Sequence, residues 1–125
     1  MTGLTLDTGA LIALERRSPR ITALLQRASE QRMSLAIPAG VVAQAWRGGG
    51  RQARLARLLA APETEIVSLD SQAARAVGAI CGEVGVDDVV DVSVVLCARR
   101  NVDRVVTSDR DDIRRIDEKV PIIEV

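Results

Sequence analysis

The sequence alternates short apolar runs with longer stretches of helical periodicity, and this alternation restricts the folds that the chain can adopt. Extended strands are expected at residues 4–6, 35–37, 66–69 and 104–106, with an edge strand at 122–123. Helices are expected at residues 8–14, 19–28, 38–47, 51–59, 71–83, 89–100 and 111–116. This order predicts an α/β fold with a parallel sheet of four to five short strands and helices on both faces. The chain has 125 residues and no repeat or linker, so we expect one domain over residues 1–125.

The composition excludes several kinds of chemistry. The chain has no histidine, which rules out Ser-His-Asp and Cys-His catalysis and histidine-bound zinc. Its single aromatic residue is Trp46, so a base-stacking platform built from several rings is also excluded. Cys81 and Cys97 lie in apolar surroundings, and we expect both to be small core residues of a reduced, cytoplasmic protein. We expect no signal peptide and no membrane span.

Charge is distributed unevenly along the chain, although the formal net charge is zero. Residues 16–57 hold nine arginines and one acid, Glu30, whereas residues 83–118 hold ten acids and six arginines. A basic half beside an acidic half is compatible with a nucleic acid bound next to a cation site. It is equally compatible with ordinary solvated helix faces.

A series of arginines follows the expected second strand. Arg47, Arg51, Arg54 and Arg57 recur at steps of four, three and three, which an uninterrupted helix would align on one face. The three glycines at 48–50 interrupt such a helix. Because arginine forks fit phosphate oxygens, Arg47 and Arg51 are our candidates for contacts to nucleic-acid phosphates, and a solvated helix face is an equally good interpretation of the series.

Several aspartates are expected to meet at the carboxyl edge of the sheet. Asp7 ends the first strand and Asp109 follows the fourth, and crevices in parallel sheets lie beyond these ends. Either residue could equally be a helix cap. Asp91 lies on the apolar face of its helix, where an ionised carboxylate is costly unless it is paired or binds a metal. Asp88, one turn earlier, and Asp112, in the first turn of the last helix, are further candidates.

A cluster of such acids is stable only if a divalent cation neutralises it. Oxygen ligands without histidine or a nearby cysteine favour Mg²⁺ or Mn²⁺ over zinc. A cation of this kind in a cleft near arginines suits the hydrolysis of a phosphodiester bond.

Four stretches resemble a known family in their residues, order and spacing. They are LDTGALI at 6–12, IPAGVVAQAWR at 37–47, the stretch from DVVD at 88–91 to residue 98, and TSDRDD at 107–112. Together they resemble the PIN-domain nucleases, and more closely the VapC-type ribonuclease toxins of bacterial toxin–antitoxin pairs. The resemblance implies a three-layer PIN-like fold and a Mg²⁺- or Mn²⁺-dependent endoribonuclease. It also implies an RNA substrate, a cognate VapB-type antitoxin and a homodimer.

The resemblance also assigns roles within a catalytic set. It implies that Asp7, Asp91 and Asp109 bind the metal, that Asp112 is a further active-site acid, and that the Thr107 hydroxyl lies beside the substrate phosphate. Asp88 is a lesser candidate for metal binding.

One position departs from the family pattern. The family's second acid is usually a glutamate on the helix after the second strand, and Gln44 stands there. Its amide oxygen is a candidate metal ligand, but the amide brings no charge and cannot act as a base. The alternative function is therefore a catalytically weakened PIN-like module that binds RNA or protein.

Overall fold

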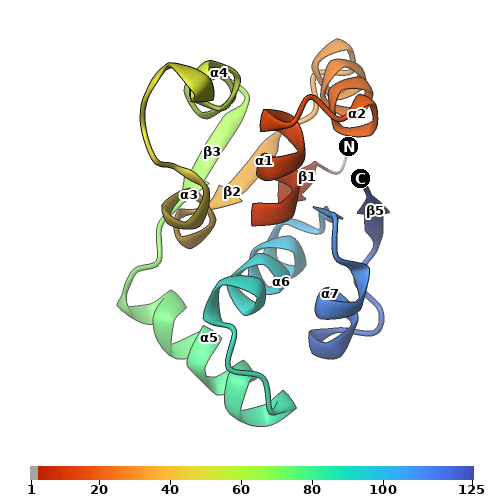
Figure 1. Cartoon of the computed structure of the whole chain (residues 1–125). Coiled ribbons are helices and arrows are strands. Elements are labelled where there is room, and N and C mark those ends of the chain that lie inside the picture. The colour runs from red at the N-terminus through yellow and green to blue at the C-terminus, as the bar shows by residue number, and fades with distance from the viewer. Residues whose placement is uncertain (1–2) are drawn as a thin grey trace.

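The computed structural model describes residues 3–125 and contains one parallel sheet (Figure 1). The strands run in the order β3-β2-β1-β4-β5, and every neighbouring pair is parallel. Their bounds are β1 Leu4–Leu6, β2 Leu35–Pro38, β3 Thr64–Val67, β4 Arg104–Thr107 and β5 Ile122–Glu124. β1 is the central strand, and its pairing with β4 joins segments about a hundred residues apart in the sequence.

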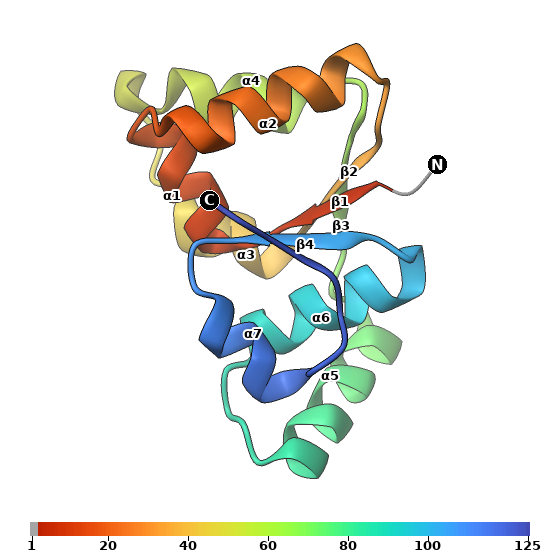
Figure 2. The same cartoon turned by 90° about the vertical axis from the view of Figure 1, so that its right-hand side faces the viewer.

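Helices cover both faces of the sheet, which gives three layers (Figure 2). The helices are α1 Thr8–Glu15, α2 Pro19–Glu30, α3 Ala39–Ala45, α4 Ala53–Ala60, α5 Ser71–Val84, α6 Val89–Asn101 and α7 Arg110–Ile116, with a 3-10 turn at Gly50–Gln52. In Figure 2, α2 and α4 lie above the sheet, and α5, α6 and α7 lie below it. The predicted three-layer α/β fold is confirmed.

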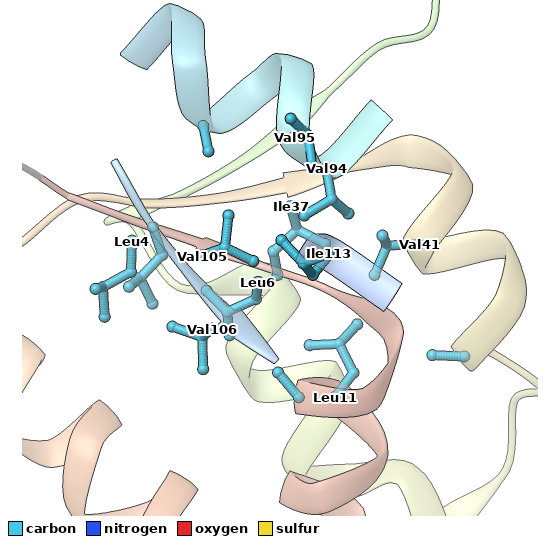
Figure 3. Packing of buried hydrophobic residues seen from close by; sticks show 14 of the residues in the cluster. Leu4, Leu6, Leu11, Ile37, Val41, Val94, Val95, Val105, Val106 and Ile113 are labelled. Carbon is cyan, nitrogen blue, oxygen red and sulfur yellow. The ribbon is translucent and has the colours of Figure 1, made fainter. Parts of the chain in front are cut away.

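The core lies on both faces of the two central strands (Figure 3). Leu4, Leu6, Val105 and Val106 have no solvent exposure. One face packs against α1, and the other packs against α6, whose valines and alanine form the expected apolar stripe. Because both faces are covered, these strands are continuous apolar runs without polar alternation.

Several predicted boundaries are wrong by a few residues. Pro38 does not open a helix, because it pairs with Val67 as the last residue of β2, and α3 begins at the next residue. The third strand ends at Val67, so Leu69 lies beyond it and is 49% exposed. β3 is an edge strand of the sheet, and the apolar residues after Val67 do not extend it.

The arginine series is not aligned on one helix. After α3 ends at Ala45, Gly48 and Gly49 adopt positive φ angles of 82° and 100°. This loop places Arg47 outside any helix and Arg51 in the 3-10 turn, while Arg54 and Arg57 belong to α4. Glycine tolerates these angles without the cost that a side chain would add.

Within residues 3–125, none of the helices has both the length and the apolar character needed to cross a bilayer.

The end of α6 contains a strained residue. Val102 caps the helix in the left-handed conformation, with φ 56° and ψ 42°, and is 70% exposed. A β-branched side chain is unfavourable there, and glycine is not. Val102→Gly should therefore stabilise the protein by roughly 0.5–1 kcal/mol, net of the extra entropy of the unfolded chain.

The measurement is urea unfolding at constant m value. Val102→Ala is the matched control, because it removes the same branching but keeps a Cβ, and it should gain much less. A midpoint for Val102→Gly at or below that of the wild type would contradict this account.

Candidate active site

The candidate site lies where the carboxyl ends of β1 and β4 meet. The chain leaves β1 toward β2 on one side, and β4 continues toward β5 on the other, so this is the point where the strand order reverses. Asp7 follows β1 directly, and Asp109 comes two residues after β4. The two loops approach so closely that a Cβ at Gly9 would collide with the Ser108 hydroxyl. The fold thus brings the carboxyl ends of the first and fourth strands together.

Asp7 is a helix cap and also part of the acidic site. Its side chain is buried, and its Oδ1 accepts a hydrogen bond of 2.9 Å from the backbone N–H of Ala10 at the start of α1. Burial raises the pKa of Asp7, and the charge of Asp109 raises it further. Hydrogen bonds from the Thr107 hydroxyl and from the N–H groups of Ala10 and Gly9 oppose this rise in pKa. The capping interaction holds the carboxylate in an otherwise unfavourable place.

Thr107 connects the two strand ends from inside the protein. Its side chain has no solvent exposure, hydrogen-bonds with Asp7, and accepts a 2.9 Å bond from the backbone N–H of Asp109. A hydroxyl in this position orients the Asp7 carboxylate and the backbone at Asp109.

Asp91 lies half-buried in the first turn of α6. Its backbone N–H donates to Oδ1 of Asp88, the N-cap of that helix, at 3.0 Å. Burial raises the pKa of Asp91 to about 7, and the charges of Asp88, Asp112 and Asp7 add to this rise. The expected helix face is confirmed, because Val94 and Val95 are fully buried beneath it.

Asp112 interacts with Asp109 through a hydrogen bond and with Asp91 through its charge. Its backbone N–H lies 3.4 Å from Oδ1 of Asp109, which caps α7. The pKa of Asp112 is raised by desolvation, then by its side-chain hydrogen bond with Asp109 and by the charges of Asp109 and Asp88. Arg115, 3.4 Å from Asp112, counters the rise. The charge of Asp109 therefore acts on Asp7 and Asp112, and the charges of these two act on Asp91.

The donor chemistry of this cluster fits a hard divalent cation. It offers carboxylate oxygens, and burial and like charges raise the pKa values of three of the acids, Asp7, Asp91 and Asp112. Among residues 3–125, however, no three acids or cysteines lie close enough to form a ready-made cage. Asp7, Asp91 and Asp109 would hold Mg²⁺ or Mn²⁺ only after their side chains move closer together.

Gln44 lies on α3 and reaches the start of α1. It is exposed, and its Oε1 accepts a hydrogen bond of 2.6 Å from the hydroxyl of Thr8, the first residue of α1. This bond places the amide beside the residue that follows Asp7. A Cβ at Gly40 would lie 3.3 Å from Val90, so α3 also begins close to the helix that bears Asp91.

The arginine-bearing loop is fastened by a residue that sequence reasoning missed. Gln52 is buried and makes four hydrogen bonds of 2.8–2.9 Å, to Arg47 N, Gly48 N, Ala45 O and Glu15 Oε1. Only the tertiary contacts reveal it, since a glutamine after three glycines has no distinctive pattern. Arg47 folds back to donate to the carbonyls of Ala43 and Trp46, and Arg51 is exposed.

Comparison with known proteins agrees with this fold. The family model of the PIN domain matches residues 4–119, so the chain belongs to the PIN-domain family. Solved structures with the same fold include FitAcB from Neisseria gonorrhoeae, at 19% identity and a TM-score of 0.62 over 97% of this chain and 96% of that one. PAE2754 from Pyrobaculum aerophilum is similar at 19% identity, with a TM-score of 0.60 over 97% and 83%.

A third structure, of FitAB bound to an IR36 DNA fragment, matches at 19% identity, with a TM-score of 0.63 over 97% of this chain and 94% of that one. No curated protein matches the sequence.

The raised pKa of Asp91 predicts a pH-dependent stability. The pKa rises from 3.8 to about 7, so the folded state binds this proton more tightly than the unfolded state does. Metal-free protein should therefore lose stability as the pH rises from about 4 to about 7. Asp91→Asn should remove that loss and be more stable at pH 8 by about 1–2 kcal/mol, after allowance for solvent screening.

Thermal unfolding in chelator across this pH range measures the effect. Asp87→Asn, a neighbouring exposed acid, is the matched control and should keep the profile of the wild type. If Asp91→Asn and the wild type gave parallel profiles, the raised pKa of Asp91 would not be the cause of the loss of stability.

Proposed function

We propose that this chain, as one PIN domain over residues 1–125, is a Mg²⁺- or Mn²⁺-dependent endoribonuclease that hydrolyses RNA phosphodiester bonds. The observation that carries the proposal is the position of Asp7 and Asp109 at the adjoining carboxyl ends of β1 and β4, with Asp91 and Asp112 near enough for their charges to interact with this pair. Such a like-charged group is costly for a protein to retain unless it binds a cation. Membership of the PIN-domain family supports nuclease chemistry.

The residues of the chain have separable roles in this proposal. Asp7, Asp91 and Asp109 would hold the cation, which supplies an activated water and offsets charge on the phosphate. The Thr107 hydroxyl orients Asp7 and the backbone at Asp109. Asp112 adds negative charge at the exposed edge of the cluster, where Arg115 limits its repulsion. Arg47 and Arg51 would bind phosphates of the RNA on the α3 side.

We propose further that the protein is the toxin of a type II toxin–antitoxin pair, with a VapB-type antitoxin, and that it acts as a homodimer in the cytoplasm. The similarity in fold to FitAcB and to FitAB, the latter bound to a DNA fragment, supports a toxin–antitoxin assignment. The resemblance of the four sequence stretches to VapC-type toxins supports the same assignment.

A second candidate function is a PIN-like module that binds RNA or protein without cleaving it. Two observations favour it: a neutral Gln44 where the family usually has an acid, and the lack, within residues 3–125, of three acids grouped closely enough for a metal. A metal titration with a cleavage assay distinguishes the two functions.

Loss of the Asp91 carboxylate is the central test of the nuclease. Asp91→Asn should lower RNA cleavage by at least about 100-fold, because it removes a charged ligand without removing volume. The assay uses a mixed-sequence RNA with Mg²⁺ or Mn²⁺, and circular dichroism verifies that the variant is folded. Either metal should raise the melting temperature of the wild type and have little effect on the variant.

Asp87→Asn is again the control and should cleave like the wild type. If the wild type leaves RNA intact with both metals and gains no stability from either, the non-catalytic module is the better description.

The arginine assignments can be tested separately. Arg51→Ala should raise KM for RNA with little change in kcat, and should reduce the slope of log affinity against log salt by about 0.7, as expected for one lost phosphate contact on single-stranded RNA. Arg75→Ala on α5 removes an equal charge from another part of the surface. An equal effect of the two substitutions would mean that general charge, and not a contact at residue 51, attracts the RNA.

A further inference from the structure

We propose that Gln44 is a phosphate-binding residue: its amide N–H group donates a hydrogen bond to a non-bridging oxygen of the RNA, and the residue is not a metal ligand. This contact rests on the nuclease function proposed above and deepens it. It gives a specific role to the position where the chain departs from the acid that is usual in the family.

The first step is the orientation of the amide. The Thr8 hydroxyl and the Gln44 amide are 2.6 Å apart, a distance typical of O–H···O bonds and shorter than most N–H···O bonds. The atom that faces Thr8 is therefore the amide oxygen, and the hydroxyl donates to it. The NH₂ group of Gln44 consequently points away from Thr8.

The second step is the state of that NH₂ group. Gln44 is exposed, and across residues 3–125 no protein acceptor takes a hydrogen bond from its nitrogen. Two donors of one side chain are thus available beside the start of α1, next to Asp7. The Thr8 hydroxyl takes one of the two lone pairs of the amide oxygen, which is the only atom of the amide able to ligate a cation.

The third step is the charge around Gln44. The acids lie directly after β1 and at the starts of α6 and α7, whereas α3 carries no acid, and the Arg47 guanidinium after its end donates to the carbonyl of Trp46 at 2.8 Å. A neutral donor on a helix without acids suits an anionic phosphate oxygen, and a carboxylate at residue 44 would repel it. The phosphate would then lie between cation-binding acids on one side and donors on the other.

The experiment separates RNA binding from metal binding. RNA affinity is measured in the cleavage-deficient Asp91→Asn background, with a fluorescent single-stranded RNA that the wild type cleaves, in chelator. Mn²⁺ affinity is measured with the metal alone, by electron paramagnetic resonance, on proteins that keep Asp91. Gln44→Ala, Gln44→Glu, Thr8→Val and Thr8→Ser are compared in both assays.

Gln44→Ala should weaken RNA binding about 10- to 150-fold, the range expected for one hydrogen bond to a charged group, and change the Mn²⁺ dissociation constant less than twofold. Gln44→Glu should weaken RNA binding more while tightening Mn²⁺ binding. Thr8→Val frees the amide to rotate and should cause part of the loss of RNA affinity, and Thr8→Ser, which keeps the hydroxyl, should restore it.

Two results would overturn the inference while leaving the nuclease intact. If Gln44→Ala weakened Mn²⁺ binding as much as RNA binding, Gln44 would be a metal ligand. If it changed neither, the residue would contact neither partner. If the wild type cleaved no RNA, or if the Asp91→Asn protein bound none, the proposed function itself would fail, and the inference would fail with it.

Discussion

The candidate site depends on local interactions that hold several carboxylates together at the carboxyl edge of the sheet, where they are partly buried and their charges repel one another. Three helices begin at this place. Asp7 caps α1, Asp88 caps α6 and Asp109 caps α7, each through a bond from a backbone N–H to its carboxylate. The positive ends of the helix dipoles and these N–H groups partly offset the repulsion. Capping and site formation are therefore the same set of interactions.

The remaining acids depend on this arrangement. Asp91 and Asp112 lie three residues after the caps Asp88 and Asp109, and their own backbone N–H groups are the ones that the caps accept. Each pair thus places one carboxylate at the start of a helix and a second one turn further on. Desolvation still raises the pKa of Asp91, so the caps do not fully compensate the cluster. The repulsion that remains among the carboxylates is the electrostatic reason why this cluster would bind a cation.

The two sides of the site differ in their chemistry. The sheet and the helices α6 and α7 supply carboxylates, whereas α3 and the loop after it supply an amide, a guanidinium and the buried Gln52 that fastens the loop. An anionic polymer bound against a metal needs such an asymmetry, because acids on all sides would repel it. Gln44 is thus part of a consistent donor side and not simply a missing acid.

The sequence by itself determined the alternation of strands and helices, the apolar stripe beneath Asp91 and the presence of acids after the first and fourth strands. These features follow from local periodicity and from residue chemistry, which need no knowledge of distant contacts. Local patterns failed at the edge strand β3, where Leu69 is apolar but unpaired, and at the arginine series, which glycines divide. Only the tertiary structure decided that β1 lies beside β4, which brings Thr107 to Asp7. It also decided that Thr8 turns the amide of Gln44 and that Gln52 joins α1 to the loop after α3. The physical reason is that these contacts join residues far apart in the chain, and a hydrogen bond between such residues exists only after the packing of the core has brought them together.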